Sequence, residues 1–175
     1  MAYTAADASE RVVLIPFAEV DGNLEDITAT EWNAGIAIHD DILKTDFAAG
    51  ATDSTVHNDT PLGSKGQWEN VSGRNATATI TVLRDLDENG RPDPEASAEV
   101  TFAAVKEPGT EFVIGVRQGP DPDEEIQADD EMRFVGIVST DVPRPPSDPT
   151  AGFIKVVVPL RVRDFETYVN VPAAG

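Results

Sequence analysis

Short strand-like segments, separated by turn-forming residues, recur along most of the chain and constrain its fold more than any other feature. In the clearest of them, Ala76 to Arg84, Thr77, Thr79 and Thr81 alternate with apolar residues, which is the period of a strand with one buried face. Most intervals between the segments have the character of loops rather than of helical crossovers, which favours antiparallel pairing in a β-sandwich. The predicted strands are Arg11–Pro16, Gly35–Ile42, Gln67–Val71, Ala76–Arg84, Glu111–Arg117, Met132–Val138 and Phe153–Val162.

One interval predicts a helix. Asp93, Pro94 and Glu95 combine a capping acceptor, a ring-fixed first position and an acidic charge near the positive end of the helix. The small residues that follow fall on one helical face and end before Pro108. Residues 98–104 also alternate in character, so a strand remains open there. We expect one α-helix packed on the sheets.

The segment from Ala48 to Lys65 shows no periodicity and is rich in glycine, aspartate and serine. We expect a long mobile loop that becomes ordered on binding a partner, because loops beyond about 12 to 15 residues are usually functional or disordered. Residues 1–10 are expected to form an N-terminal arm. Residues 1–175 are expected to form a single domain, since domains usually hold about 100 to 200 residues.

The charge balance limits the possible partners. The chain has 13 basic and 32 acidic side chains, a net charge of −19, and no basic stripe that could displace counterions from nucleic acid. Tight DNA or RNA binding is therefore excluded. With no cysteine, disulfides and thiolate metal sites are excluded as well. The N-terminus does not have the pattern of a signal peptide, and no apolar run approaches the roughly 20 residues that span a bilayer. We expect a soluble protein without a membrane partner.

The closest match to a metal-binding motif is formed by Asp85, Asp87, Asn89 and Asp93. Their spacing is that of the first, third, fifth and ninth positions of a calcium loop. The twelfth position, however, is Ala96 instead of the glutamate that closes such a loop. Asn89 is followed by glycine, the pair most typical of a tight hairpin turn. We therefore predict a plain turn and no metal.

No group of residues points to catalysis. The chain has two histidines, His39 and His57, and neither has a second ligand at metal-site spacing. His39 lies in a predicted strand and is expected to be a structural residue. The serines are not in a nucleophile elbow, the glycines form no phosphate loop, and no carboxylate pair stands out. We predict no catalytic residue, no cofactor and no enzymatic activity.

The segment TATEWNAGIAIHDDILKTDF, residues 28–47, resembles the entry segment of major tail tube proteins of long-tailed, non-contractile bacteriophages. The family pattern opens with Thr-Ala-x-Glu-x-Asn-Ala-Gly and closes with a Thr-Asp-Phe-like element. The later segments SGRNATATITVLRD and EFVIGVRQGP are similar to family segments in the same order, whereas Asp129 stands where the family commonly has glycine. The matching residues in the entry segment are Thr28, Ala29, Glu31, Asn33, Ala34, Gly35, Thr45, Asp46 and Phe47.

The resemblance implies a structural virion protein whose β-sandwich subunits form six-fold rings, stacked into a hollow tube. Genome DNA would pass through the lumen during ejection without tight binding, because a wall of carboxylates repels phosphates. The implied partners are further copies of the chain and the tape measure, tail terminator and distal tail proteins. The implied location is the virion tail, after assembly in the host cytoplasm. Candidate assembly contacts are Trp32, Phe47, Val56, His57 and Leu62.

Two other classes of protein remain open from the residues alone. An adhesion or carbohydrate-binding β-sandwich would fit the fold, but it calls for an aromatic patch, and only 6% of the residues are aromatic. An acidic enzyme would need a carboxylate pair in a cleft, and the sequence singles out none.

Overall fold

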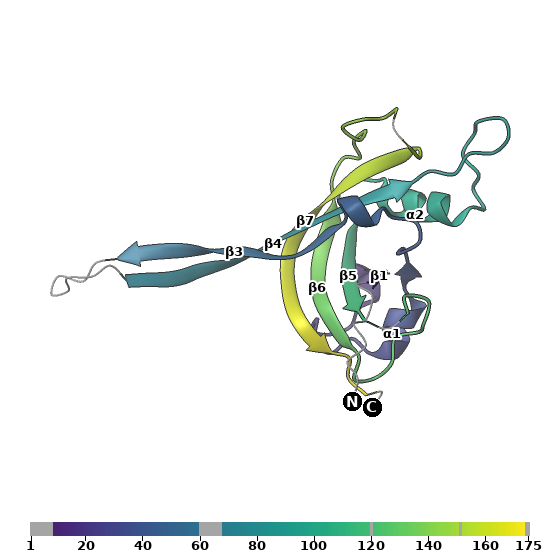
Figure 1. The fold of residues 1–175 in the computed structure, drawn as a ribbon. Helices are drawn as coiled ribbons and strands as arrows, with labels where there is room; N and C mark the ends of the chain where they lie inside the picture. Colours follow the sequence, from purple (N-terminus) through teal and green to yellow (C-terminus); the bar gives the residue numbers. More distant parts are fainter. Residues whose placement is uncertain (1–8, 60–67, 120, 151, 174–175) are drawn as a thin grey trace, which may run out of the picture.

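The structure is a computed structural model that describes residues 9–59, 68–119, 121–150 and 152–173. In these ranges, seven strands form one antiparallel sheet in the order β2-β1-β5-β6-β7-β4-β3 (Figure 1). The prediction of a mainly β, antiparallel fold is confirmed, but the strands form one curved sheet instead of the two sheets of a sandwich. The strands are β1 (Glu10–Pro16), β2 (Ile36–Ala37), β3 (Ala48–Asp59), β4 (Trp68–Leu83), β5 (Glu111–Gln118), β6 (Glu131–Thr140) and β7 (Lys155–Asn170).

Both faces of the central strands are buried, which explains why one sheet is sufficient. Successive residues of a strand point to opposite faces, and β1 and β5 carry unbroken apolar runs instead of alternating ones. One apolar cluster lies on the face covered by α2 (Ser97–Val105), and the other lies on the face covered by α1 (Ala29–Ala34). Leu14 and Ile114 belong to the first cluster, whereas Val13 and Val113 belong to the second.

The segment that opens the predicted tail tube motif forms the helix α1, directly before β2. Thr28 and Glu31 make a capping box: the Thr28 side chain accepts the Glu31 N–H, and Glu31 Oε2 accepts the Thr28 N–H at 2.7 Å. The strand predicted over Gly35–Ile42 shrinks to β2. A Cβ on Gly35 would lie 2.7 Å from Val13 Cγ1, so only glycine allows the chain to pass this close to β1.

The predicted helix exists, but it begins later than expected. Ala96 is the N-cap residue of α2 and makes no side-chain cap. Asp93, the expected cap, instead accepts the N–H of Glu95 at 3.1 Å in a separate turn. Two short 3-10 helices, η1 (Phe17–Glu19) and η2 (Lys44–Asp46), complete the elements of the described ranges.

Buried polar groups hold α2 against the sheet. Asp41, 5% exposed, accepts hydrogen bonds from Ser97 at 2.9 Å and from Thr101 at 2.6 Å. Glu99 forms a two-point ion pair with Arg84, at 2.6 and 2.9 Å. Because these paired groups are largely shielded from water, their directional bonds fix where α2 lies on the sheet.

The long mobile loop predicted for residues 48–65 is wrong over most of its length. Residues 48–59 form β3, which pairs with β4 from Ala48 opposite Thr79 to Asp59 opposite Trp68. Gln67–Val71 and Ala76–Arg84, predicted as two strands, belong mainly to the single strand β4. The remainder of the predicted loop, residues 60–65, and residues 1–8 of the predicted N-terminal arm lie outside the described residues.

Gly115 on β5 offers a sharp test of the packing around Trp32. A Cβ at this position would lie 2.4 Å from two Trp32 ring atoms and 2.7 Å from Met132 Cε. We expect Gly115→Ala to lower the free energy of unfolding by about 1–3 kcal/mol through overpacking. Urea unfolding would measure the loss. Gly73→Ala is the control, since its Cβ would meet Thr55 at an ordinary 3.8 Å, and an equal effect of both substitutions would contradict the packing described.

Candidate assembly surfaces

The most distinctive feature of the molecule is a two-stranded arm, formed by β3 and the first part of β4, that projects far from the sheet (Figure 1). The pairing of β4 with β7 covers only Ala78–Leu83. In the described part of the chain, residues 68–77 of β4 therefore pair with β3 alone. Isolated two-stranded ribbons are marginally stable in water, so an arm of this length calls for a partner surface.

The root of the arm is fixed to the body. Arg74 donates a hydrogen bond to the Phe165 carbonyl, forms an ion pair with Glu166 at 3.2 Å, and lies 4.7 Å from the centre of the Phe165 ring. The Arg74 contacts set the direction in which the arm leaves the sheet. Within the arm, Asn75 Nδ2 joins the two strands by donating to the carbonyl of Asp53 at 2.9 Å and to Thr55 Oγ1 at 3.0 Å.

The arm also carries an exposed apolar pair. Val56 on β3 and Val71 on β4 lie directly opposite one another, with exposed fractions of 46% and 68%. Opposed residues of an antiparallel pair share one face, so the two side chains form one exposed apolar spot on the ribbon. Apolar surface kept on a projecting element is typical of a contact site.

The five predicted assembly contacts lie in different environments. Trp32 is 1% exposed on α1, above Gly115, so its prediction is wrong: the indole fills the core and offers no surface to another copy. Phe47 is half-buried against the core. Val56 lies on the arm, and the backbone of His57 lies on β3 opposite Asn70. Leu62 falls outside the described residues.

The two edges of the sheet differ strongly. At one edge, the arm strand β3 is outermost. At the other edge, β2 pairs only with Val13 and Leu14 of β1. A long strand and a short strand at opposite edges give the molecule two unlike ends through which strands of another copy can be added.

A second exposed surface is the acidic loop between β5 and β6, described over residues 121–130, whose backbone is held from beneath by Arg117. The Arg117 side chain is 2% exposed. Its Nη1 donates to the Glu125 carbonyl at 3.0 Å and to Asp130 Oδ2 at 2.9 Å. Its Nη2 donates to the carbonyls of Asp121 at 2.9 Å and Glu124 at 2.8 Å. The buried cation thus orders the backbone, while the side chains of Asp121, Asp123, Glu124 and Glu125 remain exposed.

The segment that resembles a calcium loop folds as the predicted hairpin turn. Asp87 Oδ1 accepts the backbone N–H groups of Asn89 and Arg91, both at 2.8 Å. Gly90 has a φ of 75°, which suits glycine, and Leu86 and Pro92 bridge the turn. Oxygens of both Asp87 and Asp93 are therefore engaged by the backbone of their own turns.

Acid should weaken this turn. The N–H of Arg91, and to a smaller extent the groups of Asn89, lower the pKa of Asp87 below the ordinary aspartate value of 3.8. A carboxyl with a lowered folded pKa stabilises the fold above its unfolded pKa and loses that effect as pH falls through the folded pKa. We expect Asp87→Asn to lower the melting temperature at neutral pH, with the difference from wild type shrinking from about pH 4 downward. A difference independent of pH would contradict this, and Glu88→Gln is the control in the same turn.

Within the described ranges, no helix has both the length and the apolar character to cross a bilayer.

The sheet, its two unlike edges and the projecting arm define a β-protein equipped to associate through strands. The chain belongs to the phage tail tube protein family, because the family model described as "Phage tail tube protein" matches residues 1–174. It is therefore a structural component of the virion tail. No curated protein matches the chain. The family match confirms the resemblance found in the sequence and favours the tail tube over the adhesion module and the acidic enzyme.

Proposed function

We propose that six copies of this chain form a ring and that rings stack into the tube of a long, non-contractile phage tail. The observation that carries the proposal is the arm of β3 and β4, which leaves the sheet as an unsupported ribbon with Val56 and Val71 exposed. Docked on a copy in the next ring, the ribbon would gain the apolar burial that a two-stranded element lacks by itself.

Charge supports the proposed role as a conduit. Six copies, each with a net charge of −19, would give a ring of about −114. A wall of that sign repels phosphates within a Debye length of about 8 to 10 Å and offers them no counterion release. DNA could then move through the lumen during ejection without being held. The same charge opposes ring closure, so apolar contacts such as the arm must outweigh it.

The remaining elements of the proposal follow from the family. Residues 1–175 act as one tail tube domain, with residues 1–10 available as a terminal arm for contacts between copies. The tape measure, tail terminator and distal tail proteins would set the length and the two ends of the tube. Assembly would take place in the host cytoplasm, and the protein would perform no catalysis and use no cofactor.

Electron microscopy of concentrated, purified protein tests the proposal directly. We expect rings or tubes whose end views have six-fold symmetry, and we expect added salt to promote them by screening the repulsion between copies. If the purified protein does not assemble by itself, the distal tail complex is added as a seed from which the tube can elongate. Another rotational symmetry, or a failure to elongate from that seed, would overturn the proposal.

A further inference from the structure

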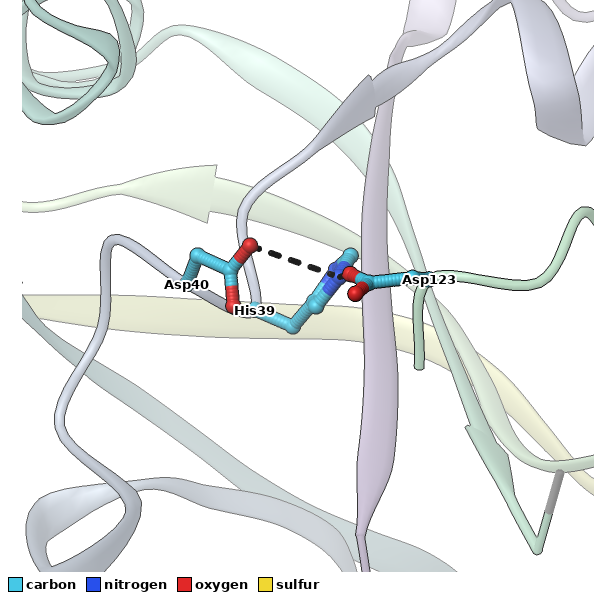
Figure 2. Close-up of side chains that lie close together, drawn as sticks. All are labelled: His39, Asp40 and Asp123. Atoms are coloured by element: carbon cyan, nitrogen blue, oxygen red, sulfur yellow. Dashed lines mark hydrogen bonds and ion pairs between the residues drawn. The ribbon is translucent and has the colours of Figure 1, made fainter. Parts of the chain in front are cut away.

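His39, Asp40 and Asp123 form a cluster that joins two distant parts of the chain (Figure 2). His39 and Asp40 lie between β2 and η2. The prediction placed His39 inside a strand, but β2 ends at Ala37. Asp123 lies in the acidic loop between β5 and β6, 84 positions from His39. The ring nitrogen Nε2 of His39 is 3.4 Å from Asp123 Oδ1 and 4.0 Å from Asp40 Oδ2.

The histidine of this cluster is buried, and its hydrogen bonding is poor. Its side chain is 9% exposed, whereas those of Asp40 and Asp123 are 84% and 82% exposed. The contact of 3.4 Å is longer than the 2.7–2.9 Å usual for a charge-assisted hydrogen bond. Nδ1 is buried without a hydrogen-bond partner among the described residues. Nε2, the ring nitrogen that faces the two carboxylates, is thus left with one long contact at 3.4 Å and one at 4.0 Å, which is a weak arrangement for a largely buried polar group.

The spacing of the three ligand atoms fits a small metal ion. Zinc bonds of about 2.0–2.2 Å in a tetrahedral site place neighbouring ligand atoms roughly 3.3–3.5 Å apart. One of the distances from Nε2 already has this value, and all three ligand atoms lie within 4.8 Å of one another. The two carboxylates are on the surface and can rotate toward a shared ion, while the buried imidazole supplies the fixed ligand.

We propose that His39, Asp40 and Asp123 bind one divalent transition-metal ion of the zinc class. Calcium and magnesium prefer oxygen ligands alone, and copper(I) prefers sulfur. One imidazole and two carboxylates suit zinc, cobalt(II) or nickel(II), with water in the fourth position. Metal binding at this site is independent of the proposed role of the chain in the tail tube.

The surroundings of the site are compatible with a cation. Arg11 interacts with the charge of Asp123, and Lys44 lines the neighbouring cavity, but the acidic loop adds further carboxylates. With the metal on Nε2, the ring proton would sit on Nδ1. A cavity of about 190 Å³, lined in part by His39, Asp40 and Lys44, adjoins the cluster.

A bound metal would fasten the acidic loop to the segment after β2. Arg117 already holds this loop from beneath through backbone carbonyls, and the metal would fix its outer side through Asp123. Because metal that binds only the folded state adds to its stability, zinc should raise the melting temperature of the protein.

The test is calorimetric titration of the full, tag-free chain with zinc chloride, in physiological salt and excess magnesium chloride. We expect one zinc per chain and a visible absorption spectrum of nitrogen- and oxygen-ligated metal when cobalt(II) replaces zinc. Asp123→Asn and His39→Gln should each weaken zinc binding at least about tenfold. Loss of a residue that merely hydrogen-bonds to a metal ligand typically costs that much, and loss of the ligand itself should cost no less. Asp123 is exposed, so its substitution leaves the fold intact even where His39→Gln does not.

His57→Gln is the matched control, because the chain has two histidines and no cysteine. We expect this variant to bind zinc as the wild type does. The proposal is overturned if the wild type does not bind zinc, if magnesium displaces zinc, if Asp123→Asn binds with unchanged affinity, or if His57→Gln loses binding. Since the titration uses unassembled protein, none of these outcomes depends on whether the chain forms six-fold tubes.

Discussion

Arg117→Met is expected to lower the free energy of unfolding by about 3–5 kcal/mol, the cost of removing one partner from a buried ion pair. The side chain of Arg117 is 2% exposed, and its guanidinium pairs with Asp130 at 2.9 Å. It also donates to three backbone carbonyls of the acidic loop. Methionine fills part of the volume but leaves these acceptors without donors. Arg11 and Asn33 also bond this loop, at the Pro122 carbonyl and the Ile126 backbone, but Arg117 alone makes four contacts with it. We therefore expect the loop to lose part of its order.

Urea unfolding and hydrogen exchange would measure the two effects of Arg117→Met separately. Arg144→Met is the matched control, since the Arg144 side chain is 59% exposed and its guanidinium lies 3.6 Å from Asp141. A surface pair of this kind contributes about 0–1 kcal/mol. Equal losses for both variants would contradict the role assigned to Arg117, and so would unchanged exchange rates in residues 121–130.

Val71→Glu is expected to suppress tube formation while leaving the single chain folded. Val71 is 68% exposed and belongs to neither apolar cluster of the core, so its replacement costs the monomer little. In the tube, the proposed contact would lose an apolar group and would have to bury a charge, which is unfavourable without a partner. Every 1.4 kcal/mol lost per contact raises the concentration needed for assembly about tenfold.

Val100→Glu provides the matched control for the arm. Val100 is 49% exposed on α2, away from the arm, and glutamate is a good helix former. Sedimentation and electron microscopy should show tubes from Val100→Glu at the wild-type concentration and none from Val71→Glu. If both variants assembled equally well, the apolar spot on the arm would have no part in the contact.

The strands that were well predicted are those whose burial follows from local pattern. The alternation from Ala76 to Arg84 identifies a strand with one buried face, and the apolar run in β5 identifies a central strand. The sandwich was predicted from the loop-like intervals between the strands, which favour antiparallel pairing but do not distinguish one sheet from two. What the pattern could not show is that α1 and α2 cover the two faces of a single sheet, because α1 is short and its helical period spans less than two turns.

The arm was missed because its stability does not come from burial. Residues 48–59 carry glycine, aspartate and serine where an ordinary strand carries apolar residues. Their pairing with β4 comes from backbone hydrogen bonds, with shifts in register near Thr55, and periodicity does not report such bonds. The polar composition that suggested a mobile loop is that of a ribbon exposed on both faces.

Contacts between distant residues were the least accessible to sequence analysis. Asp123 lies in the acidic loop between β5 and β6, and its position beside His39 depends on the order of β1, β5 and β6 in the sheet. The role of Arg117 depends on the same loop folding back over β5. A single arginine in an apolar strand, followed closely by a dense acidic turn, is the signal that could have suggested a buried cation.

The most direct test of the account is a helical reconstruction of the assembled tube at side-chain resolution. We expect the arm of each copy, with Val56 and Val71, to be seated on a copy in the adjacent ring, and the bore to be lined with more carboxylates than cationic groups. An arm that extends into solvent with both valines exposed, or a bore lined mainly by arginine and lysine, would contradict it.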